Sequence, residues 1–311
     1  MAIQRSSIKR GPAAIVIAGQ TIYSQGDIKV TIAQETFGID SAVYGKTGER
    51  MADIMIKLAF TPVGMWTAGL LAVTHPHGTP VIGASIFGSS DVPVVLHPTN
   101  GSEKITFSAG AVTKMPNLLF SATETPMKEM EITCILKNNT DRSNAAALLA
   151  ITDEAFSDSS FDLGLIYTVP YTATLASLSS PWSAIETEAG INVEFNLGLS
   201  PVKVNGLGTV DMTLSGLEVS VKLKPIGMSV ADVLTRMAIQ GSGVAIGQEI
   251  GASANNLTIT GGSGKPQATI YNVRPKNSGQ LYGNQALRHD TIEFVATRPT
   301  GGAMFALGVA S

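Results

Sequence analysis

Two stretches of the chain carry the same series of apolar residues, proline and glycine at an offset of 163 positions (219 − 56). The segment at 56–65 reads IKLAFTPVGM, and the segment at 219–228 reads VSVKLKPIGM. An internal repeat constrains the fold strongly, because both copies are expected to form the same secondary structure. We therefore begin with the hypothesis that one structural unit occurs twice.

Four further matches follow in the same order along the chain. AGLL at 68–71 aligns with ADVL at 231–234, IGASI at 82–86 with IGQEI at 246–250, GSEK at 101–104 with GSGK at 262–265, and EITCI at 131–135 with TIEFV at 291–295. Their offsets lie between 160 and 164. The repeat predicts a first unit over residues 12–138, a connector over 139–189 and a second unit over 190–300.

Upstream of these matches the offset changes. GDIKVTI at 26–32 resembles GTVDMTL at 208–214, which is an offset of 182 and implies an insertion of 19 residues in the first copy. We place this insertion at residues 34–52, a polar, glycine-containing stretch, and expect a long loop there. In the second copy, Ser215-Gly216 is expected to form a tight hairpin turn in its place.

Apolar periodicity indicates the element types. Ile54, Ile56, Leu58 and Phe60 alternate with polar or small residues, as expected for a half-buried strand. After Pro62 and Pro225 the period becomes helical, with Val230, Val233, Leu234 and Met237 on one face. Each unit is therefore predicted to consist of strands and one short helix that closes one side of a small sandwich. In the connector, NAAALLAITDEAF at 144–156 is predicted to be helical, so the fold class is mainly β with a partly helical connector.

Composition and charge exclude several classes of protein. Apolar residues make up 44% of the chain and charged residues 14%, which is the opposite of the balance in a disordered protein. A net charge of −3 argues against stable binding to nucleic acid through phosphate neutralisation. The single cysteine, Cys134, cannot form an intramolecular disulfide. No apolar run reaches the length of a membrane helix, so we expect a soluble protein made without export.

Motifs for catalysis or cofactor binding are incomplete. His75 and His77 have a spacing that metal ligands can use but lack a third ligand nearby, and a turn after the helix is favoured there. Ser85, in GASIFG at 83–88, misses the nucleophile-elbow spacing by one residue. The phosphate-loop pattern fails at 261–266, where GGSGKP has proline in place of Ser or Thr. Cys134 alternates with Ile132 and Leu136 and is assigned to the core. We expect no enzyme activity, no cofactor and no bound metal.

The positions that recur between the copies are proline, glycine and strand apolar residues, which define a shape and no reaction. In this respect the chain resembles the major tail proteins, or tail tube proteins, of long-tailed, siphovirus-like bacteriophages. The resemblance is carried by the strand–loop–strand pattern at 26–60, the turn PVGM at 62–65, PVIGASIFG at 80–88 and the closing strands near Glu131 and Thr291. It covers most of the chain outside the connector, as a pattern without a diagnostic motif.

The resemblance implies a virion structural protein that self-assembles into stacked rings and forms a conduit for double-stranded DNA during ejection. The resemblance implies that each unit is a β-sandwich or half-barrel with one flanking short helix. Members of the family place six units in each ring, so a chain with two units implies trimeric, pseudo-hexameric rings, although six chains per ring stay open. Expected partners are further copies of the chain, the tape measure and tail terminator proteins, and transient, non-specific DNA in the lumen. The expected location is the virion tail, after synthesis in the host cytoplasm. The connector is a departure from the family and leaves the packing of the two units open.

Two sets of surface residues are candidates for these roles. The strand alternation places more acids than bases on the non-core faces, where Lys29, Lys57 and Lys222 are the bases, and a weakly repulsive face would let DNA slide. An ordinary solvated sheet face would have the same pattern. The lumen-facing acidic candidates are Asp27, Asp53, Glu131, Asp211, Glu218 and Glu293, and the inter-ring candidates in the expected loop are Tyr44, Lys46, Glu49 and Arg50.

Two other functions are compatible with the sequence. A tandem carbohydrate-binding protein or another accessory virion protein would also have two β units, and carbohydrate binding would require exposed aromatic platforms. Aromatic residues are only 6% of the chain, and Trp66 and Trp182 fall at unlike places in the two copies. A hydrolase that uses Ser85 is the third alternative.

Overall fold

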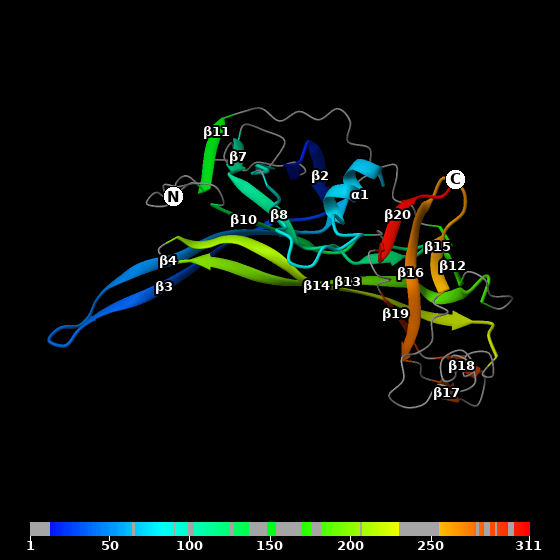
Figure 1. The fold of residues 1–311 in the computed structure, drawn as a ribbon. Coiled ribbons are helices and arrows are strands. Elements are labelled where there is room, and N and C mark those ends of the chain that lie inside the picture. Colours follow the sequence, from blue (N-terminus) through cyan, green and yellow to red (C-terminus); the bar gives the residue numbers. More distant parts are fainter. Residues whose placement is uncertain are drawn as a thin grey trace, which may run out of the picture.

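The computed structural model is mainly β, with one helix among the residues it describes (Figure 1). It describes residues 13–63, 66–89, 91–98, 103–124, 127–136, 148–153, 169–175, 182–205, 207–229, 255–277, 280–282, 287–289, 291–297 and 302–311. The elements of the first half are β1 (Ala14–Ile17), β2 (Gln20–Ser24), β3 (Lys29–Ser41), β4 (Gly45–Phe60), β5 (Pro62–Val63), α1 (Ala68–Thr74), β6 (Val94–His97), β7 (Glu103–Phe107), β8 (Ala109–Lys114), β9 (Leu118–Phe120) and β10 (Met130–Ile135). The second half has β11 (Leu149–Asp153), β12 (Thr172–Leu175), β13 (Glu186–Val204), β14 (Gly208–Ile226), β15 (Asn255–Thr260), β16 (Pro266–Asn277), β17 (Gln280–Tyr282), β18 (Leu287–His289), β19 (Ile292–Ala296) and β20 (Phe305–Val309).

Two sheets contain the same arrangement of four strands. One sheet has the order β3-β4-β10-β8, and the larger sheet contains β13-β14-β19-β16. In the first sheet the hairpin β3–β4 is followed by β10 and then by β8. In the larger sheet the hairpin β13–β14 is followed by β19 and then by β16. In both, the later of the two remaining strands lies next to the hairpin. We call β3–β4 the first hairpin and β13–β14 the second hairpin. Both extend from the body of the molecule in the same direction, and the first reaches farther (Figure 1).

The two hairpins match residue for residue at an offset of 163. Lys29 pairs with Ala59 in the first, and their counterparts Asn192 and Lys222 pair in the second. Two register shifts, each of which leaves one residue of the second strand unpaired, occur at equivalent places. The unpaired residues are Ala52 and Ser215 at one bulge and Thr47 and Val210 at the other. The turn glycines, Gly45 and Gly208, have the same φ of +70°.

The expected insertion in the first copy is therefore wrong. Residues 34–52 are not a loop: they form the distal parts of β3 and β4 and the short turn between them. The second hairpin has the same length, so the match at offset 182 aligned the second strand of one hairpin with the first strand of the other. Ser215 and Gly216 form no turn, because β14 passes through both and Ser215 is the residue of the bulge. Glycine in a strand often marks such a bulge.

The remaining strands of the two sheets are also in equivalent registers. Glu131 pairs with Ala59 and Glu293 with Lys222, which gives an offset of 162 for β10 and β19, two more than the sequence match implied. A bulge leaves Thr113 unpaired in β8 and Lys276 unpaired in β16, again 163 positions apart. By the same register, Cys134 corresponds to Ala296.

The main core lies between these sheets, the sheet β11-β7-β6-β1-β2-β5 and α1. Its largest fully buried side chains include Phe107, Phe120, Phe294 and Leu58. Burial alternates in β19 and over Ile56–Phe60 of β4, as the periodicity predicted, whereas Ile132–Ile135 of β10 are all buried. Cys134 is fully buried, as expected, and burial raises the pKa of its thiol to about 12.

The single described helix lies where the change of period after Pro62 predicted it. Thr67 caps α1, because its hydroxyl accepts a hydrogen bond from the backbone N–H of Leu70 at 3.1 Å. The helix predicted in the second copy, over 229–237, lies almost wholly outside the described residues.

The connector differs from the prediction. Leu149–Asp153, expected to be helical, is the strand β11 and pairs with β7. β12, also in the connector, pairs with β15 of the larger sheet. Both strands bury backbone hydrogen bonds against existing sheet edges, and this tertiary pairing prevails over the helix propensity of the alanine-rich segment.

Candidate assembly interface

The tip of the second hairpin packs on the first hairpin. Asp53 of β4 is only 6% exposed, and its Oδ1 accepts a hydrogen bond from the backbone N–H of Thr209 at 2.9 Å. The Thr209 hydroxyl donates to the other carboxylate oxygen. Beside this contact, Lys203 Nζ lies 2.5 Å from a carboxylate oxygen of Glu35. These contacts fix the end of the second hairpin on the middle of the first.

Residues 83–86 cover the outer side of β14. Leu214 N–H donates to Ala84, while Gly83 and Ile86 donate to Leu214 and Met212. Phe87 and Met212 pack there with Ile135 in a small second core. Residues from the first half of the chain therefore cover the β14 side of the second hairpin, whereas Ser200–Val204 of β13 are exposed.

The first hairpin beyond Asp53 has no such cover among the described residues. Its strand β3 lies at the edge of its sheet, and nearly every residue of β3 is exposed. Large apolar residues are exposed along both strands and the turn of the first hairpin. These are Val30, Ile32, Phe37, Ile39, Val43, Tyr44 and Met51, which are 38% to 82% exposed. An exposed apolar edge strand is a ready template for pairing with another chain.

The four inter-ring candidates lie at the end of this hairpin. Tyr44, in the turn, is 82% exposed, and Lys46 forms an exposed ion pair with Glu49. Arg50 pairs across the strands with Phe37 and is also exposed. The structure thus brings all four to one protruding tip, although on strands and a turn and not on a long loop.

Two of the lumen candidates do not lie on an open sheet face. Asp53 is buried under Thr209, as described above, because the tip of the second hairpin removes it from solvent. Asp211 is half-buried and accepts a hydrogen bond from the Ser85 hydroxyl at 2.7 Å. Their assignment to an exposed acidic face is therefore wrong.

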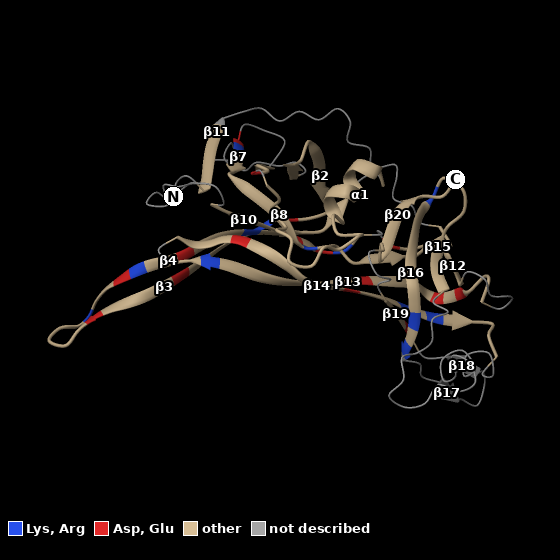
Figure 2. Cartoon of the chain, viewed as in Figure 1, with Lys and Arg blue, Asp and Glu red and all other residues tan. Residues whose placement is uncertain are grey.

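The other four acids are at the surface, and three have lysine partners. Glu131 lies 3.3 Å from Lys57 Nζ, and Lys276 Nζ lies 3.4 Å from Glu218 and 3.6 Å from Glu293. Asp27 is exposed just before β3. Figure 2 shows lysines and acids interspersed along the hairpins and the adjacent strands. Lys57 was already counted among the bases, and Lys276, which sequence reasoning did not include, offsets part of the remaining acidic excess.

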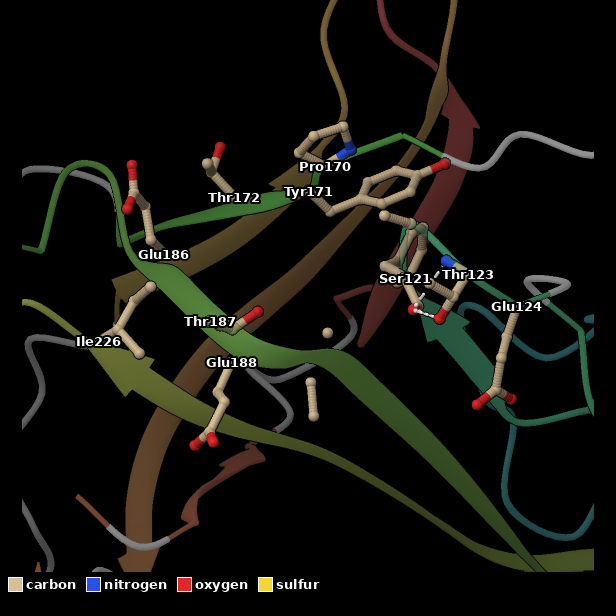
Figure 3. A pocket seen from close by; sticks show the side chains of 14 residues that line it. Ser121, Thr123, Glu124, Pro170, Tyr171, Thr172, Glu186, Thr187, Glu188 and Ile226 are labelled. Atoms are coloured by element: carbon tan, nitrogen blue, oxygen red, sulfur yellow. Dashed lines mark hydrogen bonds between the residues drawn. The ribbon is translucent and has the colours of Figure 1, made fainter. Parts of the chain in front are cut away.

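A cavity of about 540 Å³ lies at the base of the second hairpin, where β9, β12, β13 and the end of β14 meet (Figure 3). Glu124, Glu186 and Glu188 line it together with Phe120 and Tyr171. Two of the carboxylates are in ion pairs, Glu124 with Lys128 and Glu188 with Lys224. None of the described lining residues is His, Cys, Lys or Arg, and its ionisable side chains are the three glutamates.

The remaining sequence candidates for chemistry have structural surroundings. His75 is buried at the C-cap of α1, with its Nε2 2.9 Å from the carbonyl oxygen of Pro116. Ser85 donates to Asp211 with no histidine in that hydrogen bond. The described residues contain no group of three or more side chains that could hold a metal ion. Trp66 and Trp182, which a carbohydrate platform would expose, are 4% and 7% exposed.

The sequence matches no protein-family model and no curated protein. In the described part of the chain, no helix is both long enough and apolar enough to cross a bilayer. The geometry alone therefore identifies the site, which is the exposed edge and tip of the first hairpin. Sequence reasoning missed Val30, Ile32 and Phe37 in it, because alternation predicts the face of a strand and does not indicate whether that strand lies at a sheet edge.

Proposed function

We propose that this protein is a structural subunit that self-assembles into rings, and that the rings stack into the tail tube of a bacteriophage virion. The observation that carries the proposal is the pair of matched hairpins, one covered within the chain and one bare. A chain that buries one copy of a surface and exposes the other has an unsatisfied contact that a further copy can fill. The equivalent registers and bulges of the two sheets support the tandem arrangement on which this depends.

The proposed ring contains three chains. Contacts between unlike surfaces of identical chains close into a ring when the rotation allows it. Six units with two per chain require three chains, and the ring has approximate sixfold symmetry. Both units have a hairpin of the same length. Successive units around the ring therefore differ in how their hairpin is covered, and not in the presence of a longer loop.

Electron microscopy of the purified protein tests this proposal. We expect concentration-dependent rings and stacked tubes, and a high-resolution map with three chains per ring. Monomers at every protein and salt concentration would refute self-assembly. A map with six chains per ring would refute the stoichiometry while leaving the tube intact.

The proposed lumen is the face of the hairpin sheets opposite the core. On this face, Glu131, Glu218 and Glu293 form ion pairs with lysines, so the surface offers phosphates little net charge in either sign. Exposed ion pairs of this kind add little to stability, and mixed charge limits the electrostatic attraction of DNA. Such a surface suits a conduit through which DNA slides, and the proposed DNA contact is transient and non-specific.

The tip of the first hairpin is the proposed contact to the next ring. Replacing residues 37–50 by Asn-Gly removes the exposed tip but retains Glu35 and Asp53, which hold the second hairpin. We expect a folded protein with an unchanged melting temperature that forms no tubes, because the removed side chains are exposed. Circular dichroism and electron microscopy provide the two measurements.

The matched control is the equivalent excision of residues 200–213 in the second hairpin. It removes Thr209 and Met212, which are buried, so it should lower the melting temperature markedly. Normal tubes from the first excision would contradict the proposed role of the tip.

A further inference from the structure

The edges of β3 and β13 are equivalent in sequence position but differ in burial. Val193 and Phe195 of β13 are 0% and 6% exposed, whereas their counterparts Val30 and Ile32 of β3 are 47% and 56% exposed. The strands that pair with them on the inner side have the same register. The difference therefore arises on the outer side, where one edge is covered and the other is bare.

The cover of β13 comes from the first half of the chain. β9 pairs with it, Leu118 opposite Val193 and Phe120 opposite Ile191. Asn117 Oδ1 accepts a hydrogen bond from the Phe195 N–H at 3.0 Å, and the ring of His75 packs edge-on against Phe195 at 4.9 Å between centroids. A strand, an amide cap and an aromatic contact thus complete this edge.

The segment of the second half that corresponds to β9 is β17. Adding 163 to the bounds of β9 (Leu118–Phe120) gives 281–283, which overlaps β17 (Gln280–Tyr282) at two residues, and β17 follows β16 as β9 follows β8. An amide residue, Gln280, stands at the position of Asn117. In Figure 1, however, β17 lies at the opposite end of the molecule from β3. A chain cannot cover its own β3 with its own β17.

We infer that β17 of a second copy of this chain pairs with the bare edge of β3 at residues 28–30, as β9 pairs with β13 within one chain. The contact is antiparallel and places Leu281 opposite Val30, since Leu118 lies opposite Val193. Each chain offers β3 at one end and β17 at the other, so the association is head to tail. This inference rests on the self-assembly of the proposed function and names the surfaces that join the chains.

Cysteine pairs test the register directly. The variant with Val30→Cys and Leu281→Cys brings two thiols opposite each other across neighbouring chains, at a distance that cross-strand disulfides accept. Under mild oxidation we expect a ladder of linked dimers and trimers on a non-reducing gel. The control pair, Thr31→Cys and Leu281→Cys, has one thiol on the other face of β3 and should give at least tenfold less product. The native Cys134 is fully buried and should not contribute.

A charge at the edge gives a second measurement. Val30→Lys should leave the melting temperature unchanged and abolish rings, whereas Thr31→Lys, on the opposite face, should retain them. Tubes that form normally from Val30→Lys, or equal cross-linking of the two cysteine pairs, would overturn the inference and leave the proposed function standing. Linked closed rings that never stack would refute the tube and support the inference. A wild-type chain that stays monomeric, together with a Val30→Cys and Leu281→Cys variant that gives no cross-link, would refute both.

Discussion

Gly208→Ala is expected to destabilise the protein by about 3–5 kcal/mol, whereas Gly45→Ala, at the equivalent turn, should cost only about 1–2 kcal/mol. Both glycines have φ +70°, so alanine pays the same backbone strain at each. A Cβ at Gly45 meets no atom within 4 Å. A Cβ at Gly208 would lie 2.5 Å from Asp53 Oδ1 and 2.9 Å from the carbonyl oxygen of Ala52.

The difference between the two losses in the free energy of unfolding measures the contact between the hairpins. Asp53 can relieve the clash only by releasing the N–H and hydroxyl of Thr209, and a buried donor left without its partner is costly. Chemical denaturation of the two variants measures both free energies of unfolding. Asp53→Ala alone should approach the effect of Gly208→Ala. Equal destabilisation by the two glycine variants would show that the tip of the second hairpin does not bear on Asp53.

The mainly β fold and several element types were predictable because they depend on local signals. The strands at 56–60 and 219–223 and the helix after Pro62 follow from periodicity. An offset of 163 could be read from the sequence because proline and glycine occur at matching positions in both stretches. The mainly β fold therefore follows from the sequence.

The hairpins were mispredicted because they are solvent-exposed or bulged where their sequences were compared. Residues 36–51 project beyond the body, so neither face of the strands is buried and no period of two is imposed on them. Ser215-Gly216 has the composition of a turn, but in β14 it forms a bulge that the neighbouring strand tolerates. Composition does not distinguish an exposed strand from a loop in such a segment.

The placement of single charged residues failed for a related reason. Alternation assigned Asp53 to an open face, but a hairpin more than 150 positions away covers the carboxylate. Lys276 lies in a bulge of β16, where alternation gives no prediction, yet it is the partner of Glu218 and Glu293. Contacts between the two units decide these surroundings, and one sequence does not reveal them.

His75 makes the stability of the joint between the two halves dependent on pH. The ring lies at the end of α1, between Pro116 and the aromatic side chains of Phe195 and Phe305. Burial lowers the pKa of His75 from 6.5 to about 4, and the hydrogen bond to Pro116 offsets only part of that effect. The folded protein therefore keeps this imidazole neutral at pH values where the unfolded chain protonates it.

Between pH 6.5 and about pH 4, the unfolded state binds more protons than the folded state, so the free energy of unfolding should fall as the pH is lowered through this window. The loss attributable to His75 reaches about 3 kcal/mol at pH 4, since each unit of pKa shift corresponds to about 1.4 kcal/mol. Urea denaturation at pH 7 and pH 4.5 measures this loss.

His75→Gln keeps an amide donor for Pro116 and has no titratable group at this position, so its free energy of unfolding should change much less between the two pH values. His77, whose pKa burial also lowers, leaves a smaller slope of the same sign. An equal loss in His75→Gln would place the acid sensitivity elsewhere. A loss confined to the parent protein would show that the packing of α1 and β9 on β13, the contact that we infer recurs between chains, weakens when this one ring is charged.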